Sequence, residues 1–189
     1  MRLPANEIDV WLARLVADGW PRPEFLPERE RERAEQMLAG KVRDRWTAAR
    51  WALRGVLGRY LGLDPLEIEL SLGEHGKPLL ADPEAPLRFN LSHSGDVALV
   101  AVSAELEVGV DVERIGARPA AFYADWTRRE AIVKCHGTGL GRPVPETPVA
   151  VARLDVDPGY TAAVAVASDA VPPLRLLEIA PADVAVSRA

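Results

Sequence analysis

Two short stretches of the sequence carry acidic and basic side chains at spacings that suit phosphate chemistry. Asp111 and Glu113 end an apolar run that starts at Val108, and Glu130 and Lys134 follow farther along. In an extended strand the first two carboxylates point to the same face. In a helix the second pair shares one face, about a turn apart. If such a helix packs across the end of the strand, three carboxylates and one ammonium group converge.

Three carboxylates of this kind suit Mg²⁺, which typically keeps several waters and completes its shell with substrate phosphates. A simpler interpretation also fits the same residues. An Asp-x-Glu pair at a strand end is often only a solvated turn, and Glu130 with Lys134 is often only a surface ion pair. Which interpretation applies depends on the elements and motifs around these positions.

The composition limits the classes of protein to which the chain can belong. Its 189 residues suit one domain or two small lobes, and 48% hydrophobic with 27% charged residues is ordinary for a soluble globular protein. No apolar run approaches the ~20 residues that span a bilayer, and the N-terminus lacks a signal-peptide pattern. We therefore expect a cytoplasmic protein without a membrane partner. The net charge of −5 argues against nucleic-acid binding, and the single Cys135 excludes an internal disulfide and a multi-cysteine metal site.

Helices are expected in the first third of the chain. Residues 7–17 could form a strand followed by a short helix, but their pattern does not decide between strand and helix. A charged helix is expected over Pro27–Leu38, and a longer one over Val42–Leu61, where apolar residues recur every three or four positions. The arginines of the long helix, such as Arg45, should mostly be surface groups, although guanidinium geometry would let one or two reach a phosphate.

Strands and turns dominate the rest. The expected strands cover residues 67–72, 97–103, 108–113, 149–154, 160–167 and 174–179. Gly76-Lys77-Pro78 closes a glycine-containing turn in which backbone N–H groups and Lys77 could approach an anion. It is not a Walker phosphate loop, because Pro78 stands in place of Ser or Thr. Residues from Pro181 onward are expected to fray.

A Ser-His-Ser segment precedes the apolar strand at 97–103. Ser92-His93-Ser94 resembles a fragment of a serine hydrolase site. However, no G-x-S-x-G elbow is present, and the adjacent Ser92 and His93 cannot readily form a nucleophile–base pair. Without a ligand, a turn in which both side chains bond to backbone is the simpler interpretation.

Taken in order, four motifs resemble the Sfp-type 4′-phosphopantetheinyl transferases. They are Gly76-Lys77-Pro78, Phe89-Asn90-Leu91-Ser92-His93-Ser94, Gly109-Val110-Asp111-Val112-Glu113 and Trp126-x-x-Arg129-Glu130-Ala131-x-x-Lys134. The similarity covers roughly residues 38–140. It implies an α+β fold of two similar lobes in a pseudo-twofold arrangement, with the site between them. We expect an N-terminal lobe over 1–106, on the adenine and 3′-phosphate side of coenzyme A, and a C-terminal lobe over 107–189 with the metal and catalytic groups.

The resemblance also implies a reaction and roles for individual residues. Such enzymes use Mg²⁺ to move the phosphopantetheine arm of coenzyme A onto a serine of an acyl or peptidyl carrier protein, releasing adenosine 3′,5′-bisphosphate. Asp111, Glu113 and Glu130 would hold Mg²⁺, with Asp111 beside the pyrophosphate. Glu130, or a water that it orients, would take the serine proton, and Lys134 would stabilise charge on the phosphates. Phosphoryl transfer needs mainly this kind of positioning and charge neutralisation.

The remaining implied contacts concern coenzyme A. Gly76-Lys77-Pro78 would line the adenine and ribose side, and Ser92 and His93 would meet the 3′-phosphate and pyrophosphate region. Arg45 would also contact the 3′-phosphate. A monomer would suffice, because both lobes belong to one chain. Fatty-acid, polyketide and nonribosomal-peptide carriers all remain candidates for the partner.

Three departures from the family pattern leave other functions open. Only Ile115–Asp125 separate the two acidic motifs, where the family usually places an extra helix that shapes part of the carrier-docking surface. Arg129 stands where the family has lysine, and the two are not interchangeable. The tail after Gly139 is also short. A homologue that binds coenzyme A or a carrier without catalysis is one alternative, and an unrelated α+β scaffold with structural acidic residues is another. As site residues, Asp111 and Glu130 should be partly exposed.

Overall fold

The computed structural model of the chain describes residues 1, 3–73, 76–138 and 147–184. The first half contains β1 (Ile8–Arg14), α1 (Glu28–Glu35), α2 (Lys41–Leu61), β2 (Leu70–Leu72), β3 (Pro78–Leu80), β4 (Arg88–Ser94) and β5 (Val97–Ser103). The second half contains β6 (Val108–Arg114), α3 (Ala120–His136), β7 (Ala150–Leu154), β8 (Tyr160–Val166) and β9 (Leu174–Ile179). Short 3₁₀ turns lie at Pro23–Phe25 and Pro181–Asp183.

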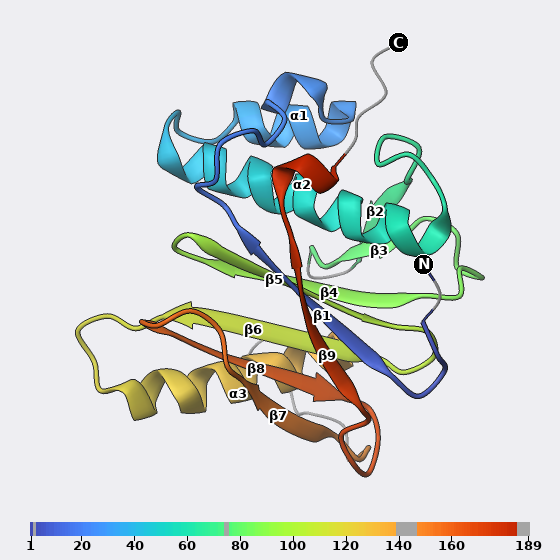
Figure 1. The fold of residues 1–189 in the computed structure, drawn as a ribbon, viewed down its shortest axis with the longest axis vertical. Coiled ribbons are helices and arrows are strands. Elements are labelled where there is room, and N and C mark those ends of the chain that lie inside the picture. Colours follow the sequence, from blue (N-terminus) through green and yellow to red (C-terminus); the bar gives the residue numbers. More distant parts are fainter. Residues whose placement is uncertain (2, 74–75, 139–146, 185–189) are drawn as a thin grey trace.

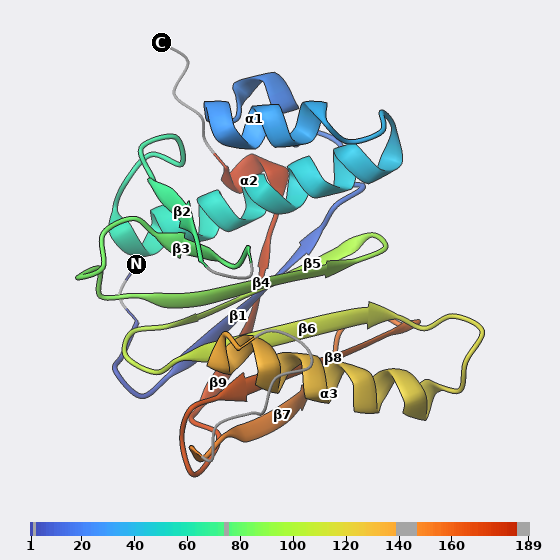
Figure 2. The same ribbon diagram turned by 180° about the vertical axis from the view of Figure 1, so that it is seen from behind.

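Two sheets stack between two long helices (Figures 1 and 2). One sheet has the strand order β4-β5-β1-β9 and the other β6-β8-β7, while β2 and β3 form a separate hairpin. The pairs within both sheets are antiparallel, except that β1 and β9 are parallel. The expected α+β class is confirmed. In the described part of the chain, no helix has the length and apolarity required to cross a membrane.

Three apolar clusters hold these layers together. The first joins α2 to the outer face of the four-stranded sheet, the second fills the space between the two sheets, and the third lies between the three-stranded sheet and α3. The sequence of strand β5 is apolar throughout because both of its faces are buried. Val97, Leu99 and Ala101 belong to the inter-sheet cluster, whereas Ala98, Val100 and Val102 pack toward α2. Alternate side chains of a strand covered on both faces must all be apolar.

Strand β9 returns from the second half of the chain to complete the first sheet. The buried Asp9 of β1 accepts two hydrogen bonds from Arg175 of β9, at 2.7 and 2.8 Å, and a third from the Tyr60 hydroxyl of α2. These contacts satisfy a carboxylate that would otherwise be costly to bury. A division of the chain at residue 106 stays a prediction, and any such division must assign β9 to the sheet of the first half.

The expected fraying after Pro181 is wrong as far as Val184. Pro181–Asp183 forms a 3₁₀ turn, and Val184 is only 6% exposed within the cluster beneath α2. It packs where Gly55 leaves room, because a Cβ added at Gly55 would lie 2.7 Å from Val184 Cγ2. The Val184 side chain and the ion pair of Asp183 with Arg59 therefore anchor this segment on α2.

Other boundaries differ from the sequence-based expectations. Residues 7–17 contain the strand β1 without a following helix, and the charged helix is shorter than expected, over Glu28–Glu35. The strand expected at 67–72 is confined to Leu70–Leu72, because its partner β3 is itself only three residues long. The helix expected to carry Glu130 and Lys134 begins ten residues before Glu130, directly after Pro119. Positions 74 and 75 of the expected turn, and the tail from 139 to 146, lie outside the described residues.

Candidate active site

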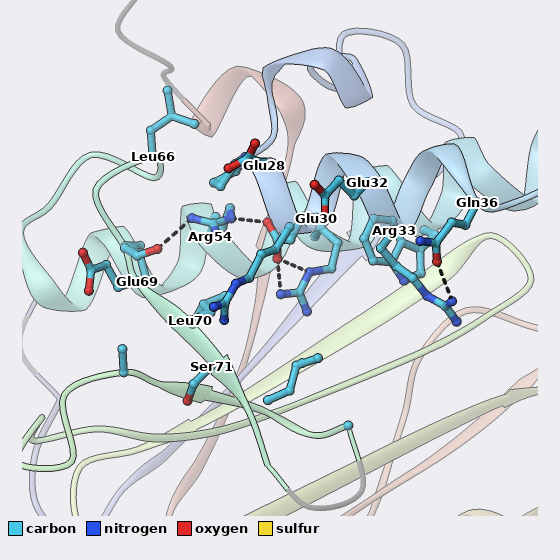
Figure 3. A pocket seen from close by; sticks show the side chains of 18 residues that line it. Glu28, Glu30, Glu32, Arg33, Gln36, Arg54, Leu66, Glu69, Leu70 and Ser71 are labelled. Carbon is cyan, nitrogen blue, oxygen red and sulfur yellow. Dashed lines mark hydrogen bonds and ion pairs between the residues drawn. The ribbon is translucent and has the colours of Figure 1, made fainter.

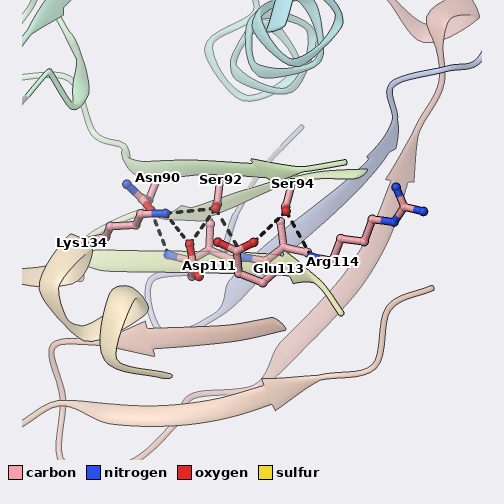
Figure 4. Close-up of polar contacts among 9 residues, drawn as sticks. Asn90, Ser92, Ser94, Asp111, Glu113, Arg114 and Lys134 are labelled. Atoms are coloured by element: carbon pink, nitrogen blue, oxygen red, sulfur yellow. Dashed lines mark hydrogen bonds and ion pairs between the residues drawn. The ribbon is translucent and has the colours of Figure 1, made fainter. Parts of the chain in front are cut away.

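Alternate polar side chains of β4 connect the two sheets (Figure 4). They accept hydrogen bonds from alternate backbone N–H groups of β6, and thereby replace the backbone ladder that would join two strands of one sheet. The three bonds run from Val110 N–H to Asn90 Oδ1 at 2.9 Å, from Val112 N–H to Ser92 Oγ at 3.4 Å and from Arg114 N–H to Ser94 Oγ at 3.1 Å. We call this set the β4–β6 ladder.

Two hydroxyls of the β4–β6 ladder also hold the acidic side chains of β6. Ser92 Oγ donates to Asp111 Oδ1 at 2.9 Å, and Ser94 Oγ donates to Glu113 Oε2 at 2.8 Å. Both strands have a side-chain period of two, so the two serines match the two carboxylates in spacing. The role of Ser94 was not predicted from the sequence. The signal was present, because Ser-x-Ser and Asp-x-Glu have the same spacing.

Helix α3 brings the other two charged residues to this place. Lys134 Nζ lies 2.6 Å from Asp111 Oδ1 and 3.0 Å from Ser92 Oγ. Close packing of α3 on β6 depends on Gly109, where an added Cβ would lie 2.1 Å from the carbonyl oxygen of Ala131. The absent side chain at Gly109 therefore sets how near Lys134 comes to the carboxylates.

Burial perturbs both of the central carboxyl groups. Burial raises the pKa of Asp111, and this effect is opposed by the charge of Lys134 and by the hydrogen bond from Ser92. The pKa of Glu130 is also raised, first by desolvation and then by the negative charge of Asp111, with a smaller contribution from Glu113. The expectation that Asp111 is partly exposed is wrong: it is 3% exposed, because it lies in the middle of β6 under α3. Glu130 is half-buried, as expected.

The donor chemistry of these residues fits Mg²⁺. Asp111 Oδ2 and Glu130 Oε1 are buried oxygens without a hydrogen-bond partner among the described residues, and carboxylate oxygens are the usual ligands of this ion. Lys134 already neutralises the other oxygen of Asp111. In the part of the chain that the structure describes, no three Asp, Glu, His or Cys side chains form a group that could hold a metal ion as they stand.

A pocket of about 300 Å³ opens where α2, β4 and α3 meet. It is lined by Trp46, Ala49, Arg50, Gly76, Pro78, Leu91, Ser92, His93 and Lys134. Five of the sequence-predicted site residues are therefore brought together, and Ser92 and Lys134 connect the pocket to Asp111. The pKa of His93 is lowered, first by desolvation and then by the positive charges of Lys134 and Arg50. The two cationic groups of the lining, Arg50 and Lys134, favour an anionic ligand.

Lys77 and Arg45, which were predicted to contact the nucleoside and the 3′-phosphate of coenzyme A, lie outside the lining of this pocket. Lys77 Nζ donates to the carbonyl oxygen of Lys134 at 3.1 Å and lies 3.9 Å from Glu107, and burial lowers its pKa. Arg45 forms an ion pair with Asp96 in the turn between β4 and β5. The coenzyme A contacts of Lys77 and Arg45 therefore stay predictions.

A larger pocket of about 950 Å³ lies between α1, α2 and β2 (Figure 3). Glu30 of α1 accepts hydrogen bonds in it from Arg50 Nε at 2.5 Å and from Arg54 Nε at 2.6 Å. Arg54 also donates to the backbone carbonyls of Pro65 and Ile68. Arg50 belongs to the lining of both pockets. The sequence analysis expected surface arginines in α2, and is wrong for these two because their pairing with Glu30 permits burial.

Comparison with known proteins agrees with the motifs. Residues 21–105 match the family described as 4′-phosphopantetheinyl transferase, N-terminal. The 4′-phosphopantetheinyl transferase HetI of Nostoc sp. (strain PCC 7120) is 29% identical over 195 residues, which cover 85% of this chain and 78% of HetI. AcpT of Escherichia coli (strain K12), also a 4′-phosphopantetheinyl transferase, is 40% identical over 141 residues, or 59% of this chain and 66% of AcpT. The chain therefore spans just under two thirds of AcpT. The motifs, their meeting at one pocket and these relatives together support a 4′-phosphopantetheinyl transferase.

Proposed function

We propose that the protein transfers the 4′-phosphopantetheine arm of coenzyme A to a serine of an acyl or peptidyl carrier protein, in a Mg²⁺-dependent reaction that releases adenosine 3′,5′-bisphosphate. One observation carries this proposal: the pocket lined by Arg50, His93 and Lys134 adjoins the buried carboxylate of Asp111, which Lys134 contacts. Cationic groups for a pyrophosphate beside oxygen ligands for a divalent ion are what phosphoryl transfer requires.

Basic side chains of the pocket would bind the phosphates. Arg50 suits bidentate contacts with phosphate oxygens, and Lys134 offers a compact positive charge. Gly76 and Pro78 present a wall without long side chains for the nucleoside. Arg45 and Lys77 would contribute from beyond this lining, at the 3′-phosphate and at the adenine and ribose. All of these residues come from one chain, so a monomer suffices.

The carboxylates Asp111, Glu113 and Glu130 would hold Mg²⁺. A bound Mg²⁺ would neutralise charge on the pyrophosphate oxygens. Ser92 and Ser94 would keep Asp111 and Glu113 oriented through their hydrogen bonds. Lys134, which contacts Asp111 in the structure, is close enough to the pocket for its ammonium group to move onto a phosphate oxygen.

Glu130 would act as the base, directly or through a water. Its Oε1 has no hydrogen-bond partner among the described residues, so it is available to accept the proton of the carrier serine. The serine oxygen then forms a bond to the phosphorus that bears the pantetheine arm. The bond from that phosphorus to the bridging oxygen breaks, and adenosine 3′,5′-bisphosphate leaves with the electron pair.

The test is transfer with purified components. The protein is incubated with coenzyme A, Mg²⁺ and apo-carriers of the fatty-acid, polyketide and nonribosomal-peptide types, and each carrier is weighed by intact-protein mass spectrometry. We expect at least one carrier to gain the mass of the phosphopantetheine arm, and EDTA to prevent the gain. Absence of transfer to every carrier by a folded protein would contradict the proposal.

A second candidate is a homologue that binds coenzyme A without catalysis. It is favoured by the short connection between β6 and α3, which consists of residues 115–119 only and leaves no room for the extra helix of the family. Calorimetry separates the two candidates. Binding of coenzyme A by a protein that transfers nothing would support the second, whereas binding with transfer supports the first.

A further inference from the structure

The Lys77 side chain connects the turn before β3 to the end of α3. Its ammonium nitrogen Nζ donates to the backbone carbonyl of Lys134 at 3.1 Å, and the side chain is only 17% exposed. The two residues are 57 positions apart in the sequence, so this contact depends on the tertiary fold. A cation bound to a backbone oxygen acts on no particular side chain of its partner. Its effect must therefore be on the position of the helix end itself.

The carbonyl that Lys77 contacts lies where α3 runs out of its own hydrogen bonds. The Gly137 N–H donates to the Val133 carbonyl at 2.9 Å, and Gly137, with a φ of 68°, ends the helix. The next carbonyl, that of Lys134, has thus lost the N–H group that a further helical turn would supply. A helix C-terminus also carries partial negative charge, which favours a nearby ammonium group. Lys77 therefore caps α3.

The capped residue is also the one whose side chain reaches the acidic groups of the candidate site (Figure 4). Lys134 Nζ lies 2.6 Å from Asp111 Oδ1 and 3.0 Å from Ser92 Oγ. The backbone of Lys134 is thus held by Lys77, and its side chain by β4 and β6. Because a lysine side chain is long and flexible, the position of its ammonium group depends on how firmly the backbone beneath it is held.

The turn that presents Lys77 is closed by backbone hydrogen bonds. The Gly73 N–H donates to the Lys77 carbonyl at 2.8 Å, and the Gly76 N–H donates to the Gly73 carbonyl at 2.9 Å. Gly76 and Pro78 line the pocket, whereas the Lys77 side chain between them extends to α3. With the ammonium group engaged there, a contact of Lys77 with the nucleoside is left to its backbone.

The start of β6 supports the same contact. Lys77 Nζ lies 3.9 Å from Glu107 Oε2, and the negative charge of Glu107 opposes the lowering of the Lys77 pKa by burial. Glu107 thus favours the charged form that donates to α3. The backbone carbonyl of Glu107 also accepts a hydrogen bond from the Cys135 thiol at 3.2 Å. One residue therefore contacts both Lys77 and the last turn of α3.

We propose that Lys77 is a positioning residue for the transfer: by capping α3 at Lys134, it holds the Lys134 ammonium group between Asp111 and the coenzyme A pocket. This inference rests on the proposed function. The turn that lines the pocket is thereby coupled to the group that neutralises charge on the phosphates. Since the Lys77 ammonium group touches no substrate, Lys77 acts on the rate of the chemical step and not on the affinity for coenzyme A.

Lys77→Met tests the cap, because it keeps an unbranched side chain and removes the ammonium group. We expect kcat to fall roughly 10- to 100-fold, as a small displacement of a reacting group does. The KM for coenzyme A should stay within about twofold of the wild type, because the backbone of the turn is unchanged. The control is Lys41→Met, at an exposed position that begins α2, which should change neither value. A raised KM with an unchanged kcat would overturn the positioning role and make the Lys77 side chain a nucleotide ligand.

A double-mutant cycle asks whether Lys77 acts through Lys134. If it does, Lys77→Met should cost nothing further in a protein that already carries Lys134→Met, so the two proteins should transfer at rates within about twofold of each other. Losses that multiply would overturn the proposal. Should Lys77→Met not fold, Lys77→Gln takes its place in both experiments with the same expected results, because its polar side chain is one bond shorter than lysine.

The position of Lys134 can also be followed without the reaction. The chain contains three lysines, Lys41, Lys77 and Lys134, so NMR of protein with isotope-labelled lysine resolves their ammonium groups. The Lys134 ammonium protons should exchange slowly with water in the wild type, because two side-chain oxygens hold them, and rapidly in Lys77→Met. An unchanged Lys134 signal would overturn the cap whatever the activity. A changed signal in a protein that transfers nothing would uphold the cap and contradict the transferase alone.

Discussion

Helices α2 and α3 each cover the outer face of one sheet, yet among the described residues only α2 is itself covered. All twelve residues from Thr47 to Gly58 of α2 are buried, because α1 lies over the side that faces away from the sheet (Figure 1). In α3 the buried residues are Thr127, Ala131 and Cys135, which form a single stripe at four-residue spacing.

The difference in burial corresponds to a difference in role between the two helices. Covered on both sides, α2 uses its buried arginines to join α1 and the loop before β2, and these contacts hold the fold together. Covered on one side by the described residues, α3 carries Lys134 and Glu130 at the candidate site and leaves Phe122 and Trp126 exposed. Four predictions test this contrast.

The largest effect is expected where α1 meets α2. Glu30→Ala leaves the buried guanidinium groups of Arg50 and Arg54 without their common carboxylate, so unfolding free energy should fall by about 3–5 kcal/mol. Chemical denaturation measures this loss. The exposed neighbour Glu28 is the control, and Glu28→Ala should stay within about 0.5 kcal/mol of the wild type. Equal stability of the two variants would show that the ion pairs do not hold α1.

The next effect concerns chemistry rather than stability. Asp111→Asn keeps the side-chain shape and a partner for Ser92 but removes the charge beside Lys134, so transfer should fall roughly 100- to 1,000-fold. The melting temperature should move by no more than about 3 °C. Asp155→Asn, in an exposed position after β7, should leave both unchanged. A variant that simply unfolds would assign Asp111 a structural role.

Two glycines offer a matched pair: Gly109 of β6 packs against α3, and Gly55 lies within α2. A Cβ at Gly109 would lie 2.1 Å from the backbone oxygen of Ala131, whereas a Cβ at Gly55 would meet only the side-chain ends of Val184 and Ile179. Gly109→Ala should cost about 1–3 kcal/mol or more and also reduce transfer, because α3 must move away from β6. Gly55→Ala should cost less, since alanine gains about 1 kcal/mol of helix propensity. Denaturation and transfer assays on both variants check the order.

The smallest expected effect concerns the reactivity of Cys135, on the face of α3 that packs against the sheet. It tests whether this face is as inaccessible to solvent as the buried residues of α2. Burial raises the pKa of the Cys135 thiol to about 11 from an ordinary value near 9. At pH 8 the native thiolate fraction should therefore be about 100-fold lower than in the unfolded chain, and alkylation should follow unfolding. Burial of the neutral thiol contributes stability below about pH 9, which is lost as the pH rises toward 11. Rapid labelling of the native protein at pH 8 would show that α3 opens from the sheet.

Elements with a local signal could be predicted from the sequence. The apolar runs of β5, β6 and β8 and the stripe of α2 depend on short-range periodicity, and all four elements are present. Pairings between distant residues were not predictable in this way. The parallel pairing of β9 with β1 and the burial of Val184 join segments more than 100 residues apart, and nothing in either segment alone indicates its partner.

The candidate site shows the same division. The acidic and basic types and their spacing drew attention to Asp111 and Lys134, which the structure places 2.6 Å apart. The burial of Asp111 and the use of Arg50 depend on which elements cover them, and the sequence contains no local sign of that.

The β4–β6 ladder has a consequence for how this chain can change over time. Asn90, Ser92 and Ser94 fasten the two sheets to each other, and two of them also hold Asp111 and Glu113. A substitution at these codons can therefore have two costs. It weakens the contact between the two sheets, and at Ser92 or Ser94 it also removes the hydrogen bond that orients an acidic side chain. A copy of the gene released from selection for activity would still need this polar pattern to keep its halves joined.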